Sequence, residues 1–263
     1  MRISASFFAA LLGISALFNP ISVSAVTQPW QNPAFILNAF HQIALKNEYS
    51  PGEQKVRKWT HPVSVWIEHK VGDRQLHNEL VTLHLQHLSA LTGLQFTKAA
   101  SEQSANLSIL FTRQSTWFRD AQKLFRTKDT SFLNGAVCAA HFATNGRGSL
   151  TKAAVVIPVD QARMHGKLVA CVVEEITQTM GLPNDSEQVY PSIFNDRTPE
   201  DLLSGLDSIL IRMLYQPDIK PGQSWNMVKP KLEQTLKTWQ KDGTLARANA
   251  EIRRGGLYKL MGL

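Results

Sequence analysis

The stretch Cys171-Val-Val-Glu174-Glu175-Ile-Thr-Gln178-Thr-Met-Gly181-Leu182-Pro183-Asn184-Asp185 is the most informative part of this 263-residue sequence. Apolar residues recur through it at helical spacing and predict a helix over residues 164–180 with a narrow buried stripe. The stripe consists of Val169, Val172, Val173, Ile176 and Met180. Glu174, Glu175 and Gln178 lie with Cys171 on the opposite side, so the helix is expected to present one continuous polar surface.

The predicted helix has a clear end. Gly181 can adopt the positive φ that terminates helices, and Pro183 prevents the helix from continuing. The chain is therefore expected to turn sharply and to return Asn184 and Asp185 towards the polar surface. This combination favours a functional surface over the alternative, a plain surface helix with solvated glutamates and a glycine cap.

Two kinds of chemistry fit these residue types. Glu174, Gln178 and Asn184 offer one charged and two neutral oxygens, a set closer to the needs of Ca²⁺ than of zinc, and Asp185 can add a carboxylate. Without a metal, Glu174 and Glu175 can divide into acid and base if burial separates their pKa values. Adjacent helical residues diverge by about 100°, which disfavours a shared proton. The sequence therefore specifies neither a metal nor another cofactor.

The same stretch resembles the zinc-binding helix of metzincin peptidases, H-E-x-x-H-x-x-G-x-x-H. Glu174, Gln178 and Asn184 stand at its three ligand positions, and Glu175 stands at the position of the general base. The stretch is also similar to an uncharacterised family of exported bacterial proteins. That family has the signature Cys-x-x-Glu-Glu-x-x-Gln-x-x-Gly-Leu-x-Asn-Asp, which begins here at Cys171.

The resemblance implies an α+β, zincin-like fold, in which a twisted mixed sheet carries a central active-site-like helix and the C-terminal part is helical. It also implies a cleft along an edge strand, with residues 152–159 beside the cleft and Cys138 close enough to tie to the helix. Residues 206–215 resemble the C-terminal helix of matrix-type metzincins. Residues 190–194 occupy the place of the Met-turn without matching it.

Three function classes follow from the resemblance. The first is a hydrolase in which Glu175 is the general base and Glu174, Gln178 and Asn184 position water or substrate. The second is a pseudo-peptidase that binds a peptide or a cell-envelope ligand without turnover. The third is a structural envelope component whose Glu174 and Gln178 serve as internal hydrogen-bond partners.

The N-terminus predicts export. Arg2, an apolar segment over residues 7–18 and the sequence Val23-Ser24-Ala25 are typical of a secretory signal peptide over residues 1–25. Cleavage would leave residues 26–263 as a single zincin-like domain in the periplasm or outside the cell, with no transmembrane segment. A retained N-terminal anchor is the alternative.

The two cysteines, Cys138 and Cys171, are expected to form a disulfide because the chain is predicted to be exported. The alternative is a nucleophilic Cys138 with His141 nearby. The formal net charge is +7, but Lys and Arg are scattered, with no run longer than the pair Arg253-Arg254. No nucleic-acid partner is expected.

The rest of the chain mixes helices and strands, which indicates an α/β or α+β domain. Helical spacing predicts helices at residues 33–46, 73–91, 117–125, 200–215 and 227–239. Strands are expected within residues 59–69, where residues 63, 65 and 67 alternate, and at residues 105–112, 136–144 and 152–159, the last two joined by a turn at residues 145–148. His84 and His87 are expected on the polar face of the helix at residues 73–91.

Overall fold

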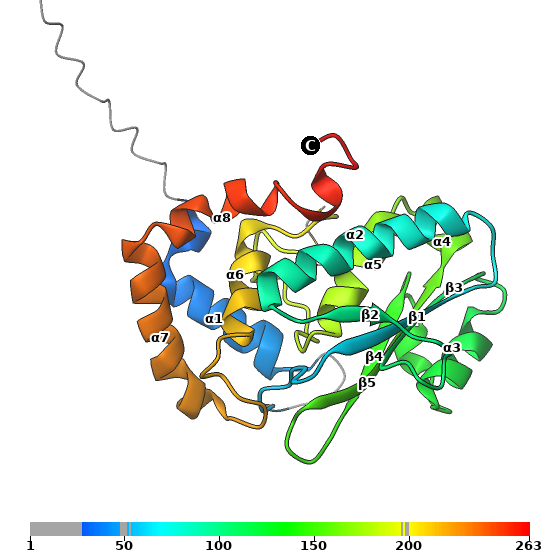
Figure 1. Ribbon diagram of the computed structural model, residues 1–263, viewed down its shortest axis with the longest axis horizontal. Helices are drawn as coiled ribbons and strands as arrows, with labels where there is room; N and C mark the ends of the chain where they lie inside the picture. The colour runs from blue at the N-terminus through cyan, green and yellow to red at the C-terminus, as the bar shows by residue number, and fades with distance from the viewer. Residues whose placement is uncertain (1–27, 48–51, 53, 196, 198–199) are drawn as a thin grey trace, which may run out of the picture.

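The computed structural model describes residues 28–47, 52, 54–195, 197 and 200–263. The signal peptide expected over residues 1–25 lies outside the described residues. One five-stranded mixed sheet is flanked by helices, as Figure 1 shows, which is consistent with the α+β class expected from the sequence. Within the described ranges, no helix is both long and apolar enough to cross a membrane.

The strands are β1 (Val63–His69), β2 (Phe96–Lys98), β3 (Leu107–Thr112), β4 (Ala139–Thr144) and β5 (Leu150–Pro158). Their order in the sheet is β2-β1-β3-β5-β4, and all pairs are parallel except β4 with β5. The antiparallel pair is a hairpin, whose turn is held by Asn145 Oδ1 accepting from the backbone nitrogens of Arg147 and Ser149 at 2.9 and 3.0 Å. The short strand β2 was not predicted, because three residues are too few to show alternation.

The edge strand differs from the expectation. Residues 152–159 were expected beside a cleft, but β5 lies inside the sheet between β3 and β4. The strand at that edge is β4, because the hairpin places it outside β5. Sequence alternation shows that both segments are strands but carries no information on which of them lies at the edge.

The helices are α1 (Pro33–Leu45), α2 (Arg74–Thr92), α3 (Trp117–Phe125), α4 (Val159–Met164), α5 (Leu168–Gln178), α6 (Gly205–Leu214), α7 (Trp225–Lys241) and α8 (Thr244–Ile252). The helix expected over residues 164–180 is thus α5 alone. Gly166, at φ 68°, separates it from α4. The helix expected from residue 200 begins at Gly205, where the Ser204 side chain caps it by accepting from Asp207 N. The helix α8 was not predicted.

The two faces of the sheet bury alternate residues of the same strands. On β3, Ile109 and Phe111 pack into the main core with α2 and α5, whereas Leu110 packs with α3. The smaller cluster on the α3 side includes Trp117 and Ala121. This alternation follows from the pleat, which directs successive side chains to opposite faces. Helix α5 therefore rests against the sheet on its main-core side.

The helix α2 covers α5 and buries two histidines that were expected to be polar surface. His84 is 1% exposed and His87 is 9% exposed. His84 Nε2 lies 3.0 Å from Thr177 Oγ1 on α5, and the Thr177 hydroxyl donates to Val173 O. His84 is therefore the donor in the first of these bonds. The expectation was wrong because it considered α2 without the helices that pack on it.

Candidate functional site

A cleft of about 960 Å³ lies between the edge strand β4 and the helix α5. Residues 136–142 form one wall, and Glu174, Glu175 and Gln178 lie on the other. The segment that follows α5 completes the lining with Asp185 and Asn195. The cleft therefore gathers most of the polar residues that the sequence singled out.

The polar side of α5 is more buried than a surface helix allows. Glu175 is 6% exposed although it lines the cleft, and Glu174 and Gln178 are half-buried. Val169, expected in the core stripe, is also half-buried. The interpretation of α5 as a plain surface helix is therefore wrong, because α2 and the sheet cover one side and the cleft encloses the other.

Gly181 makes the sharp turn that brings the chain back to α5. Its φ is 108°, and a Cβ atom at this position would lie 1.9 Å from Arg57 O. Only glycine satisfies both constraints. After the turn, Gln178 Nε2 donates to Asp185 Oδ1 at 3.1 Å, so the end of α5 and the returning segment are directly connected.

Asn184, the third ligand-equivalent position, does not join this group. It is 8% exposed and is not part of the cleft lining. Its Nδ2 donates to Asp185 O at 2.8 Å, and its backbone nitrogen donates to Ile43 O at 3.3 Å. The structure thus brings together Glu174, Glu175, Gln178 and Asp185, and it uses Asn184 to fasten the returning segment.

These donors do not fit zinc. Among the described residues, no group of three or more His, Cys, Asp or Glu side chains is arranged to hold a metal ion. Gln178 presents its amide nitrogen to Asp185, and nitrogen donors of this kind are not metal ligands. The site offers carboxylate chemistry instead, for binding cations or for accepting protons.

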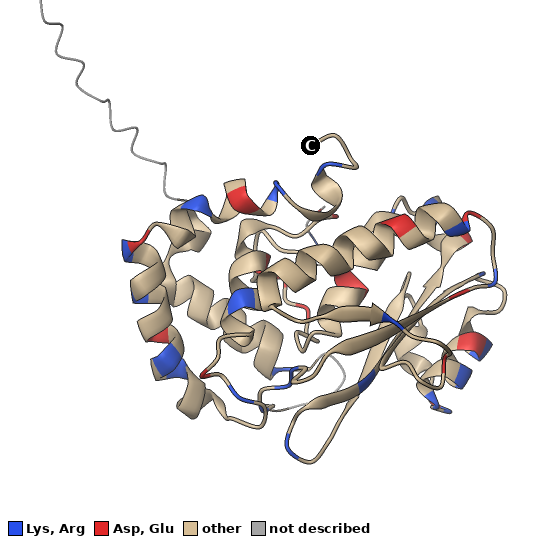
Figure 2. Cartoon of the chain, in the orientation of Figure 1, with Lys and Arg blue, Asp and Glu red and all other residues tan. Residues whose placement is uncertain are grey.

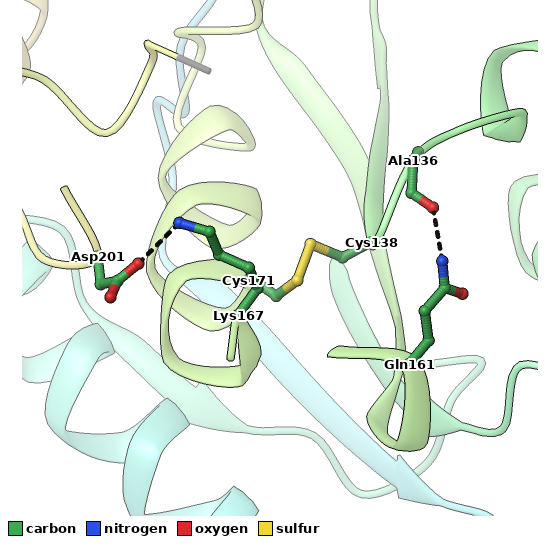
Figure 3. The surroundings of a disulfide bond; sticks show 6 residues. All are labelled: Ala136, Cys138, Gln161, Lys167, Cys171 and Asp201. Atoms are coloured by element: carbon green, nitrogen blue, oxygen red, sulfur yellow. Dashed lines mark hydrogen bonds and ion pairs between the residues drawn. A yellow bond between two sulfur atoms is a disulfide. The ribbon is translucent and has the colours of Figure 1, made fainter. Parts of the chain in front are cut away.

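The two walls of the cleft are covalently joined. Cys138 and Cys171 form a disulfide with their Cα atoms 5.9 Å apart, as the sequence predicts (Figure 3). The alternative of a nucleophilic Cys138 assisted by His141 is therefore wrong. His141 lies on β4, is exposed and lines the cleft.

Two polar contacts hold the rims of the cleft beside the disulfide. Gln161 Nε2 on α4 donates to Ala136 O at 3.2 Å and fastens the segment before β4. Lys167, just before α5, forms an ion pair of 3.0 Å with Asp201 (Figure 3). Both contacts reach from the region around α4 and α5 to segments that border the cleft.

Asp207 is a buried carboxylate that sequence reasoning missed, and it holds the backbone at Ile193, a residue that lines the cleft. It is fully buried on α6, where it accepts from Ser192 Oγ at 2.6 Å and from Ile193 N at 3.1 Å. Burial raises the pKa of its carboxyl to about 6, although these hydrogen bonds act in the opposite direction. The spacing Ser204-x-x-Asp207 is that of a capping box and could have drawn attention to this carboxylate.

The cleft is acidic although the protein carries a formal net charge of +7. Its acidic lining residues are Asp129, Glu174, Glu175, Asp185 and Glu200. Lys167 also lines it, but Asp201 pairs with this lysine. Figure 2 shows the basic residues spread over several elements, including the outer helices α3 and α7. The cleft thus differs in charge from the molecule as a whole.

Residues 33–234 match the family described as protein of unknown function (DUF2927). The chain belongs to this family. The matched range runs from α1 into α7, so the DUF2927 region includes both walls of the cleft, the disulfide and Asp207. A comparison with curated proteins found no match. The function of the DUF2927 protein therefore has to be argued from the cleft itself.

Proposed function

We propose that the DUF2927 protein binds an extended, basic polypeptide in the cleft between β4 and α5. The observation that carries this proposal is the position of β4. Among the described strands it pairs only with β5, and it lines the cleft opposite the acidic helix α5. An edge strand beside a cleft can add a peptide as a further strand, with backbone hydrogen bonds supplying affinity.

The size and charge of the cleft support the same ligand. A volume of about 960 Å³ is far larger than a single ion needs and is in the range of sites for small molecules and short peptides. The carboxylates of α5 and of Asp185 face a ligand lying along β4. Complementary charge favours Lys or Arg side chains in that ligand and speeds its association.

The scaffold is proposed to be metzincin-like, with the zinc centre lost. A mixed sheet, an antiparallel edge strand, a helix beside it and a glycine turn at its end all support that relationship. The signal peptide expected over residues 1–25 would place the protein in the periplasm or outside the cell. Its polypeptide ligand would then be a secreted or cell-envelope protein.

Binding can be tested with a capped, fluorescent heptapeptide of alternating valine and lysine. A counterpart with glutamate in place of lysine serves as the ligand control. Anisotropy should show binding of the basic peptide alone, and Glu174→Lys should weaken it by about tenfold or more, as expected for opposing charge in a partly enclosed site. Glu79→Lys, an exposed change on α2, makes the same change in net charge and should have no effect. Equal binding of both peptides would contradict the proposal.

Hydrolysis is the second candidate, and the burial of Glu175 favours it. A carboxylate that is 6% exposed and still lines the cleft is a suitable proton acceptor for water attacking a peptide carbonyl. The proton would then pass to the leaving amine. Mass spectrometry of the basic peptide after incubation should reveal cleavage. Glu175→Gln should slow cleavage by about 10²–10⁴. If the peptide remains intact after incubation with the wild-type protein, hydrolysis is contradicted and the protein binds the peptide without cleaving it.

A further inference from the structure

The disulfide links the two surfaces between which the ligand is proposed to lie. Cys138 immediately precedes β4, and Cys171 lies on α5 one helical turn before Glu175. Both cysteines line the cleft. The bond therefore fixes the beginning of the edge strand relative to the acidic side of α5.

The segment before β4 has weaker ties than the strand itself. From Ala139 onward, β4 is held by its ladder with β5. Leu133 and Phe125 are buried in the small cluster beside α3. The intervening residues 134–138 contain no helix or strand. Val137 packs partly buried against the main core and Ala136 against the small cluster, and Gln161 donates a hydrogen bond to Ala136 O (Figure 3). The disulfide is the one covalent bond between this segment and α5, so its loss would leave the segment held by this partial packing and by hydrogen bonds, with the β4–β5 ladder unchanged.

We propose that the Cys138–Cys171 disulfide is a redox switch for the cleft, and that its reduction by a dithiol weakens ligand binding. This inference rests on the proposed binding function. Cys138 is the accessible half of the bond, because it is half-buried whereas Cys171 is 1% exposed. Thiols reach exposed disulfide sulfurs more readily than buried ones.

The exchange is balanced by the dithiol. One of its thiolates attacks Cys138 Sγ, the Sγ–Sγ bond breaks, and Cys171 leaves as a thiolate. The second thiol of the reductant then displaces Cys138 and closes a cyclic disulfide. Two electrons pass from the dithiol to the protein, and the two protons of the dithiol end on Cys138 and Cys171.

Reduction would lower affinity because the ligand would have to order the rim. A preformed site avoids the entropy cost of immobilising chain segments on binding. Affinity should therefore fall by about tenfold, with the fold retained. The acidic side chains themselves remain on α5, so the preference for the basic peptide over the acidic one should persist.

The test uses the alternating valine–lysine peptide with oxidised protein, dithiothreitol-treated protein and the double variant Cys138→Ser/Cys171→Ser. The reduced protein and the double variant should bind about tenfold more weakly than the oxidised protein. Dithiothreitol should not change the double variant further. Gln161→Ala, which removes one hydrogen bond to the same segment, should remain sensitive to dithiothreitol.

Hydrogen exchange identifies the cause of any loss of peptide affinity. After reduction, we expect faster exchange of the backbone amides over residues 134–140 and unchanged protection of β1 and β3. If reduction lowers the protection of backbone amides throughout the sheet, the disulfide stabilises the whole fold, and the proposed switch is overturned. Equal affinities of the oxidised and reduced proteins would overturn the switch alone. Failure of the oxidised protein to bind the basic peptide would overturn the proposed function and the switch with it.

Discussion

Gln178 and Asp185 meet across the glycine turn, with Gln178 Nε2 at 3.1 Å from Asp185 Oδ1 and at 3.4 Å from Asp185 Oδ2. An ionised carboxylate only accepts hydrogen bonds, so the glutamine must present its amide nitrogen to it. Gln178 therefore acts as a donor that holds a carboxylate in the cleft, although it occupies a position that suggested a metal ligand. The pair connects the last turn of α5 to the segment that closes the cleft.

The coupling between these two residues should be measurable. Gln178→Ala and Asp185→Ala should each lower the free energy of unfolding, and the double variant should lose less than the sum. The difference should be about 1 kcal/mol, as for hydrogen bonds to charged groups that are partly exposed. Urea unfolding of the four proteins at pH 7 provides the values. Strictly additive losses would show that the hydrogen bond contributes nothing to stability.

Gly181→Ala should be among the most damaging single substitutions on this chain. The new Cβ would lie 1.9 Å from Arg57 O, at a residue whose φ is 108°. The expected loss is at least about 3 kcal/mol, since a steric clash adds to backbone strain. Gly166→Ala is the matched control, because Gly166 also has positive φ but no atom of the described part of the chain lies within 4 Å of its added Cβ. It should lose only about 1–2 kcal/mol. Similar melting temperatures for the two variants would refute the role of the Arg57 contact.

Asp207 should make stability depend on pH between about 4 and 6. Burial raises its pKa from the model-peptide value of 3.8 to about 6, so the folded protein holds this proton more tightly than the unfolded chain. Stability from this group is therefore present below about pH 4 and is lost as pH rises through about 6. Urea unfolding of wild type and Asp207→Asn across this range should show the decline in the wild type alone.

Asp120 provides the control for that measurement, with the opposite sign. Burial acts to raise the pKa of this carboxyl, but hydrogen bonds from Lys70, Thr112 and Thr116 hold it below the ordinary value. The contribution of Asp120 to the free energy of unfolding is therefore present at neutral pH and is lost in acid. Asp120→Asn should flatten the acid side of the stability profile. The free energy of unfolding of each variant is subtracted from that of the wild type at every pH. If this difference does not change with pH for Asp207→Asn but does change for Asp120→Asn, the assignment to Asp207 is contradicted.

His77 should sensitise the protein to acid. Its ring is fully buried, stacks on Phe111 with centroids 4.2 Å apart, and has no hydrogen-bond partner at either nitrogen among the residues that the structure describes. Burial, and then the nearby His69 and Arg163, lower its pKa to about 4, so stability is lost as pH falls from about 6.5 through 4. His77→Phe should keep or raise stability at pH 7, by up to about 1 kcal/mol, because an unsatisfied polar ring is replaced.

His84, two turns further along α2, gives the contrast. His84→Phe removes the hydrogen bond to Thr177 and should destabilise the protein at pH 7 by about 1–2 kcal/mol. Thermal melts from pH 4 to pH 8 would separate the two substitutions. If His77→Phe behaves like His84→Phe at neutral pH, then the ring of His77 is making a polar contact that the apolar stack does not account for.

The sequence by itself determined the local features of this protein. Residue periodicity predicted α1, α2, α3 and α7 within two residues of their observed ends. Gly181 and Pro183 predicted the turn after α5, because glycine at positive φ and proline both act on their own backbone. The two cysteines predicted their bridge, since two thiols allow a single pairing. Each of these inferences depends on a few neighbouring residues or on simple counting.

Only the tertiary structure decided which elements enclose the site. The placement of β4 rather than β5 at the edge depends on pairing between distant strands, and no single strand's pattern encodes it. Glu175, His84 and Asp207 are polar residues whose burial is created by elements packed on a second side of their helices. Asp185 rather than Asn184 joins α5, because Asn184 is held by backbone groups of Asp185 and Ile43. Amphipathic spacing identifies the first buried face of a helix, whereas the second is decided by what folds over it.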